Sequence, residues 1–223
     1  MDLQPLILTF NLALITSFLL LLVGIPLAYW LAFTPARIKP AIEALVSMPL
    51  ILPPTVLGFY LLVAFSPGNA FGAWLDHWLG LQLIFSFEGL VFASIIYSLP
   101  FMVQPVQSGF TAIPRNLMEA SYILGKSKRT TLWKILLPNI KSSILTGLVL
   151  SFAHTIGEFG VVLMIGGNIP GKTKVASIAI YDEVESLNYG EANLYSLTLF
   201  IICFGILLAV YLINGSYTKN RHL

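Results

Sequence analysis

Residues 6–33 form an unbroken stretch without a single charged side chain. A helix needs about 20 predominantly apolar residues to cross the hydrocarbon core of a bilayer, so this stretch is long enough to span a membrane. Only 10% of the 223 residues are charged, whereas about 25% are charged in ordinary soluble domains. The sequence therefore predicts a polytopic membrane protein and excludes a water-soluble domain.

About five segments are long and apolar enough to span a membrane, which predicts an all-α fold with about five transmembrane helices. The Met48-Pro49 and Pro53-Pro54 pairs interrupt the second span, and we expect them to kink or break its beginning because proline lacks a backbone N–H. We expect residues 1–223 to form one transmembrane domain. The expected spans are residues 6–33, 44–65, 89–106, 140–163 and 194–213.

The distribution of Lys and Arg predicts the orientation of these spans. Most of them lie between the first and second spans, between the third and fourth spans, and after the fifth. Because segments rich in Lys and Arg stay on the cytoplasmic side, the N-terminus is predicted outside and the C-terminus in the cytoplasm. The formal net charge is only +2, which leaves no large basic surface for a nucleic acid.

The segment at residues 107–139 has the pattern of a structured cytoplasmic loop. Leu117, Ala120 and Leu124 recur at spacings of three and four, which places them on one face of a helix. Gly125 permits the backbone angles that end a helix, and Ser127 is suited to cap a second one. The sequence predicts two short helices that meet at this glycine. By pattern alone they could lie on anionic lipid or dock onto a protein.

The sequence of this loop resembles a motif of permease subunits in binding-protein-dependent ABC importers. Residues 119–125 read Glu-Ala-Ser-Tyr-Ile-Leu-Gly and residues 135–138 read Ile-Leu-Leu-Pro, which matches E-A-A-x3-G-x9-I-x-L-P except that Ser121 replaces an Ala. The resemblance implies a coupling helix that seats in a cleft of a cytoplasmic ATPase. Glu119 would make polar contacts there, Ala120 would pack closely and Gly125 would form the turn. The coupling residues that it implies are Glu119, Ala120, Ser121, Gly125, Leu137 and Pro138.

Three further segments resemble the molybdate, sulfate and tungstate branch of this family, and the molybdate permeases above all. They are residues 48–58, 157–160 and 167–173. The resemblance implies a multi-pass permease of the bacterial inner membrane that translocates molybdate by alternating access, with tungstate or sulfate as alternative substrates. It also implies a second copy of the chain, an ATPase dimer that binds ATP and Mg, and an extracytoplasmic binding protein. This chain itself would bind no cofactor and have no catalytic site, and no residue cluster has metal-ligand spacing.

Polar groups at the interrupted spans are candidates for the substrate pathway. Hydroxyls, amides and backbone N–H groups can contact an oxyanion without trapping it, which favours Pro53, Pro54, Thr55 and Asn168. Gly157 and Gly160 flank Glu158, so they permit close helix approach or local unwinding, which suits either a packing role or a gate.

Two ionisable residues inside the fourth expected span have alternative interpretations. His154 and Glu158 are four residues apart, so a continuous helix would place them on one face. Glu158 could bond His154, a neighbouring helix or a second copy of the chain, or it could lie near the outer end of the span where water reaches it. Alternatively, it could act as a gate that repels or reorients an oxyanion. An intramembrane enzyme with His154 and Glu158 as acid and base is the alternative from another class.

Residues 166–173 match the nucleotide-binding pattern G-x-x-x-x-G-K-[ST] literally. A phosphate-binding loop needs a preceding strand and a following helix held by a parallel sheet. Here an apolar span precedes the segment, which is predicted to lie outside the cell. We therefore interpret the match as a coincidence and assign ATP hydrolysis to another polypeptide.

Overall fold

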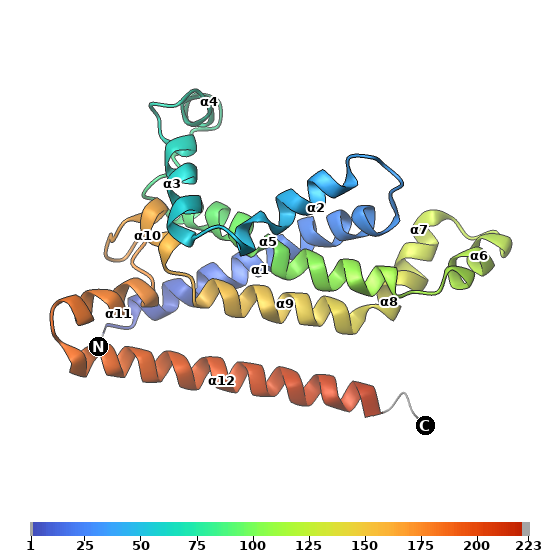
Figure 1. The fold of residues 1–223 in the computed structure, drawn as a ribbon. Helices are drawn as coiled ribbons and strands as arrows, with labels where there is room; N and C mark the ends of the chain where they lie inside the picture. The colour runs from blue at the N-terminus through green and yellow to red at the C-terminus, as the bar shows by residue number, and fades with distance from the viewer. Residues whose placement is uncertain (1, 220–223) are drawn as a thin grey trace.

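The structure is a computed structural model that describes the backbone of residues 2–219 and the side chains of residues 2–212, and this part of the chain is helical with no β-strand (Figure 1). The long helices are α1 (Gln4–Phe33), α5 (Phe87–Thr111), α9 (Lys141–Ile156) and α12 (Tyr189–Lys219). Shorter helices are α2 (Lys39–Ser47), α3 (Pro54–Phe65), α4 (Ala70–Leu79), α10 (Gly160–Gly166) and α11 (Ala176–Glu185). The loop between α5 and α9 contains α6 (Arg115–Ile123), α7 (Lys128–Thr131), a π-helical turn (Leu132–Leu136) and α8 (Leu137–Asn139).

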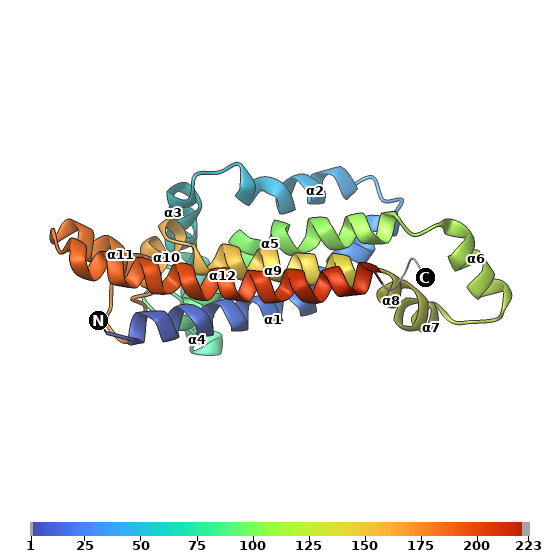
Figure 2. The ribbon, with the colours of Figure 1, turned by 90° about the horizontal axis from the view of Figure 1, so that it is seen from below.

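Helices α1, α5 and α9 lie side by side and form the centre of the bundle (Figures 1 and 2). Their contacts bury apolar side chains such as Leu20, Met102 and Phe110. Phe110 also packs edge-on against Tyr29 and Phe33 of α1, with ring centroids 5.5 and 5.9 Å away. The outward faces of α1 and α12 are apolar as well, as expected for helices that are surrounded by lipid.

The second expected span is broken, as the prolines predict. The chain bends by 111° between a helical segment at Lys39–Leu50 and helix α3. Pro53 directly precedes α3 and Pro54 is its first residue, where a missing N–H costs no intrahelical bond. The bend places the start of α3 beside the break in the fourth span.

The fourth expected span, residues 140–163, is interrupted in the structure. Helix α9 ends at Ile156 and α10 begins at Gly160, so residues 157–159 form a non-helical link. The backbone carbonyl of Glu158 accepts a hydrogen bond from Ser177 Oγ at 2.7 Å instead of continuing the helix. At the other end of α9, the chain bends by 70° between the Lys128–Asn139 segment and α9. Within the described residues, three helices are long and apolar enough to span a membrane alone, and up to five spans result if each bent pair counts as one.

Helix α12 is attached to the bundle mainly at its beginning. The Tyr195 hydroxyl donates to the Asp2 carbonyl at 2.8 Å and accepts from the Asp2 N–H at 3.0 Å. The apolar stretch of α12 is almost entirely exposed on the surface of the bundle. It runs beside α9, which it contacts at a few residues (Figure 1).

The segments that are rich in Lys and Arg gather at one end of the bundle. The α1–α2 connection, the loop with α6 and α7, and the end of α12 lie there, whereas α4, α10 and α11 lie at the opposite end (Figures 1 and 2). This arrangement is the one that the predicted orientation requires, because segments on the same side of a membrane must share one end.

Candidate functional site

The break between α9 and α10 opens onto a cavity of about 430 Å³. Helix α3 contributes its first residues to the wall, α5 contributes Tyr97, and the end of α9 contributes His154. Five residues predicted from the sequence meet here, namely Pro54, Thr55, Gly157, Glu158 and Gly160. Pro53 lies one residue before this wall, at the N-cap of α3. The full lining is Pro54, Thr55, Tyr97, Ala153, His154, Gly157, Glu158, Phe159 and Gly160.

Glu158 is bonded to α5 and not to His154. Its Oε2 accepts a hydrogen bond from Ser94 Oγ at 2.8 Å, and its side chain is buried, with only 4% exposed. Because α9 ends before Glu158, the expectation that it shares a helical face with His154 is wrong. Of the alternatives left open by the sequence, the bond to a neighbouring helix is the one observed.

His154 is held separately from Glu158. Its Nδ1 lies 2.9 Å from Ser98 Oγ, which also lies 3.0 Å from Thr155 Oγ1. The imidazole stacks on Phe101, with ring centroids 4.0 Å apart. His154 and Glu158 therefore do not form the acid–base pair that an intramembrane enzyme would need.

The two serines of α5 are the site residues that sequence reasoning missed. Ser94 and Ser98 are fully buried and four residues apart, so they share the helix face that meets Glu158 and His154. Two hydroxyl groups at this spacing within an apolar span could have identified these residues as part of a polar site, because buried hydroxyls need hydrogen-bond partners.

Asn168 lies outside this cavity. Its side-chain amide donates to Asp182 Oδ1 and Oδ2 at 2.8 and 2.7 Å, and Lys174 Nζ lies 2.6 Å from the same carboxylate. These residues fix the connection between α10 and α11 at the end of the bundle. Asn168 therefore does not share the cavity with Thr55.

The segment that mimics a nucleotide-binding loop is the α10–α11 connection. It follows a helix and not a strand. Thr173 is fully buried; its hydroxyl donates to the Gly166 carbonyl at 2.7 Å and accepts from the Ile169 N–H at 3.1 Å. The threonine that would contact Mg²⁺ in a P-loop closes a structural turn in this chain.

We expect Thr173→Val to destabilise the protein, because it leaves the Gly166 carbonyl and the Ile169 N–H without their partner. Each such loss costs about 1–3 kcal/mol when the group is buried. Thr173→Ser keeps the hydroxyl and is the matched control. Thermal unfolding of the detergent-purified protein measures the difference, and equal melting temperatures for the two variants would contradict this role.

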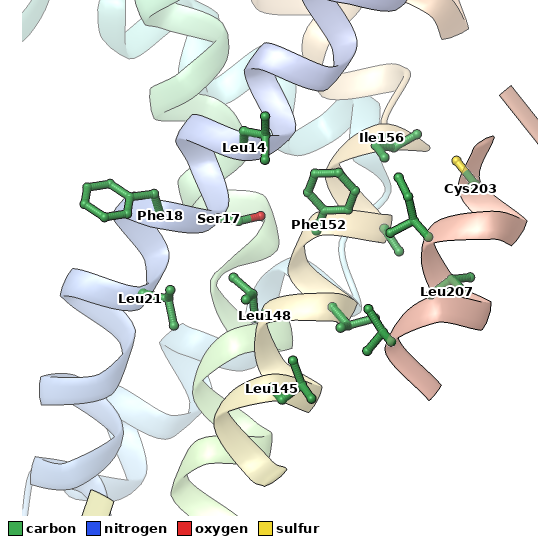
Figure 3. A pocket seen from close by; sticks show the side chains of 14 residues that line it. Leu14, Ser17, Phe18, Leu21, Leu145, Leu148, Phe152, Ile156, Cys203 and Leu207 are labelled. Atoms are coloured by element: carbon green, nitrogen blue, oxygen red, sulfur yellow. The ribbon is translucent and has the colours of Figure 1, made fainter. Parts of the chain in front are cut away.

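A larger crevice of about 610 Å³ lies between α1, α9 and α12 (Figure 3). Leucine and phenylalanine side chains such as Leu14, Phe18 and Phe152 form its wall, and Ser17 is among its few polar residues. An oxyanion would lose its hydration there without gaining hydrogen bonds, which is costly. The smaller cavity at Glu158 is therefore the better candidate for a polar substrate.

The loop predicted to couple the chain to an ATPase is a protruding pair of short helices. Gly125 has φ +70°, and its N–H donates to the Tyr122 carbonyl at 2.9 Å, so α6 ends there in a left-handed turn. Ser127 caps α7 by accepting from the Thr130 N–H at 3.2 Å. Both features agree with the sequence prediction. The loop begins only after Thr111, because α5 is longer than expected.

Ser121, the one departure from the family motif, joins the two loop helices. Its hydroxyl lies 2.8 Å from Thr131 Oγ1, and both residues are buried. Glu119 and Ala120 remain exposed beside it. At the tip of α6, Ile123 and Leu124 are 85% and 74% exposed, which is unusual for apolar side chains at a membrane protein's polar end.

Leu137 and Pro138 lie at the base of the loop, within α8. Leu137 packs against the apolar core between α1 and α5, next to the buried Leu136 and Ile140. The two ends of the motif therefore have different surroundings. Glu119 and Gly125 are exposed on the protruding part, whereas Leu137 anchors the loop to the bundle.

Residues 24–218 match the family of binding-protein-dependent transport system inner membrane components. The chain is 47% identical over 211 residues to the molybdenum transport system permease protein ModB of Azotobacter vinelandii, covering 94% of this chain and 93% of the relative. It is 33% identical to ModB of Haemophilus influenzae, covering 95% and 92%. A probable sulfate transport permease, cysT of Zygnema circumcarinatum, is 34% identical over 83% of this chain and 63% of its own length.

Two solved ABC transporters have a similar fold. The MetNI methionine transporter superposes with a TM-score of 0.74 at 17% identity, covering 96% of this chain and 94% of that one. A bacterial importer of alginate superposes with a TM-score of 0.75 at 18% identity, covering 97% and 80%. The fold is that of an ABC transporter permease. The chain belongs to the family of binding-protein-dependent transport system inner membrane components, whose members are multi-pass transport permeases and not enzymes.

Proposed function

We propose that this chain is the permease subunit of an ATP-driven importer that carries molybdate across the bacterial inner membrane. The observation that carries the proposal is the 47% identity to a molybdenum permease along 94% of the chain. Tungstate and sulfate are the alternative substrates, and the 34% identity to a probable sulfate permease makes sulfate the one to test most strictly.

The proposed assembly contains two copies of this chain embedded in membrane lipid. Two ATPase subunits join it on the cytoplasmic side, and a molybdate-binding protein joins it on the extracytoplasmic side. The exposed Ile123 and Leu124 on α6 support the ATPase as partner of the loop, because apolar side chains at a polar membrane surface are stabilised by docking. Glu119 and Ala120 flank this surface and are proposed to contact the ATPase with it. ATP and Mg²⁺ would bind to the ATPase subunits.

Helix α9 is the proposed connection between the loop and the substrate pathway. It is joined to the loop through α8 at Lys141, and it ends at the cavity with His154 in its last turn. With 16 residues it is about 24 Å long. When ATP closes the ATPase dimer, movement of the docked loops would tilt α9 and change the cavity at its other end. Alternating access then follows from the bends at both ends of this helix.

The cavity at Pro54, Thr55, Gly157, Glu158 and Gly160 is the proposed part of the substrate pathway in this chain. Support comes from its hydroxyl and imidazole groups, which can bond to an oxyanion, and from its place between two broken spans. Asn168 is proposed to act only at the outer end, because it is bonded to Asp182.

Uptake of labelled molybdate at nanomolar concentration tests the proposal, in cells with and without this chain and with excess tungstate or sulfate as competitor. We expect uptake that requires the chain and is blocked by tungstate but not by sulfate. Competition by sulfate without competition by tungstate would move the substrate to sulfate. Uptake that does not depend on the chain would refute the proposed function.

A further inference from the structure

Glu158 is a buried carboxyl group, and none of the Lys and Arg side chains that the structure describes forms an ion pair with it. The described salt bridges join Lys39 to Glu43 and Lys174 to Asp182, and neither involves Glu158. His154, the nearest basic residue along the chain, is bonded to Ser98. A carboxylate that is 4% exposed and has no ion pair would be very costly at membrane depth. Protonation removes this cost.

The hydrogen bonds of Glu158 fit a neutral carboxylic acid. Such an acid has one carbonyl oxygen, which accepts, and one hydroxyl, which donates. Oε2 accepts from Ser94 at 2.8 Å, as the carbonyl oxygen should, whereas Oε1 is buried and has no partner. The unpartnered Oε1 is therefore free to carry the proton and to donate a hydrogen bond to an acceptor.

The residue lines the cavity described above, together with Tyr97 and His154 as the other titratable groups. Helices α3 and α10 bring only uncharged residues to this wall, and on α11 Ser177 bonds the backbone of Glu158. An ionised Glu158 would repel a doubly charged oxyanion, whereas a protonated one would offer it a hydrogen bond. The charge of this one side chain therefore decides whether the cavity can accept an anion.

We propose that Glu158 acts as a permanently protonated hydrogen-bond donor, so that the cavity presents an uncharged wall to a tetrahedral oxyanion. The inference rests on the proposed function and extends it to one named group. No proton is transferred to the substrate. Oε1 is buried in this conformation, so its hydroxyl donates a hydrogen bond to the substrate once the cavity widens around it. Ser94 holds the carboxyl group in place. Ser94 is accordingly a positioning residue.

The test compares Glu158→Gln with Glu158→Ala in the complete transporter, with binding protein and ATPase, reconstituted in lipid vesicles. Glutamine is uncharged and keeps an N–H donor, so we expect molybdate uptake within about twofold of the unaltered protein. Alanine removes the donor, and uptake should fall by about tenfold to a hundredfold, as expected for losing a hydrogen bond to a charged group. Glu158→Met, which has no donor but similar length, replaces the alanine variant if that variant does not reach the membrane.

Infrared spectroscopy at neutral pH provides a readout that is independent of transport. A carboxyl group in water has a reference pKa of about 4 and is ionised at neutral pH, so it gives no carboxylic acid band. We expect a carboxylic acid C=O band in the unaltered protein that is missing in Glu158→Gln but kept in Glu43→Gln, the matched control.

Loss of uptake in Glu158→Gln, normal uptake in Glu158→Ala or Glu158→Met, or no difference in the acid band would each overturn the inference. If the unaltered transporter fails to carry molybdate in the same assay, the proposed function is refuted instead, and the acid band still tests the protonation of Glu158.

Discussion

Gly125→Pro is expected to abolish transport while the membrane bundle stays intact. Proline fixes φ near −65°, whereas Gly125 has φ +70°, and it removes the N–H that donates to the Tyr122 carbonyl. The exposed Ile123 and Leu124 would then leave their place at the tip of α6. Because 1.4 kcal/mol of lost docking free energy is a factor of ten in affinity, we expect at least about a tenfold loss of uptake.

Gly80→Pro is the matched control for this variant. Gly80 also ends a helix with a positive φ, +62°, and an added Cβ at either glycine would meet no atom within 4 Å. It lies at the other end of the bundle, after α4. Uptake, ATPase activity and copurification of the ATPase subunit measure the effect. Equal losses in both variants, or normal ATPase coupling in Gly125→Pro, would contradict the role of the loop.

Gly160→Ala is expected to damage the proposed substrate cavity, whereas Gly157→Ala is not. A Cβ at Gly160 would lie 2.8 Å from Pro54 Cβ, and the proline ring cannot move aside without displacing α3. Overpacking of this kind costs about 1–3 kcal/mol. A Cβ at Gly157 would meet nothing closer than the Ala153 carbonyl oxygen at 3.7 Å, an ordinary contact.

Each alanine variant adds one methyl group to the unaltered protein, and the two positions are three residues apart. Each variant is therefore a control for the other. Thermal unfolding of the purified protein and molybdate uptake measure the effect. We expect a lower melting temperature and reduced uptake for Gly160→Ala only. Equal melting temperatures, or a larger loss in Gly157→Ala, would show that α10 does not depend on its close approach to α3.

The sequence predicted the short helices of the proposed coupling loop more accurately than the residues that line the cavity. Gly125 and Ser127 mark the ends of short helices by local backbone chemistry, and the structure has both at the predicted positions. The break at Pro53-Pro54 was predicted for the same reason. Rules of this kind involve only residues that are close in sequence, so these helix ends and this break can be predicted from the sequence alone.

The break at residues 157–159 was allowed by the sequence, because Gly157 and Gly160 permit local unwinding, but the sequence did not require it. Glycine and glutamate are compatible with a helix, and the apolar run continues past them to Leu163. The chain leaves the helix where Ser177 bonds the Glu158 carbonyl, Ser94 bonds its side chain and Gly160 contacts Pro54. Ser94 is 64 residues away in sequence, and no local pattern encodes a partner at that distance.

The sequence by itself determined that this chain is a helical membrane permease with an exposed loop between its third and fourth spans. Apolar length, the placement of Lys and Arg and a family motif are properties of consecutive residues. Only the tertiary structure decided which polar groups share a cavity: Thr55 and Glu158 meet there, whereas Asn168 is bonded to Asp182 at the end of the bundle. The physical reason is that buried polar groups must find partners, and the packing of distant helices determines which partners are within reach.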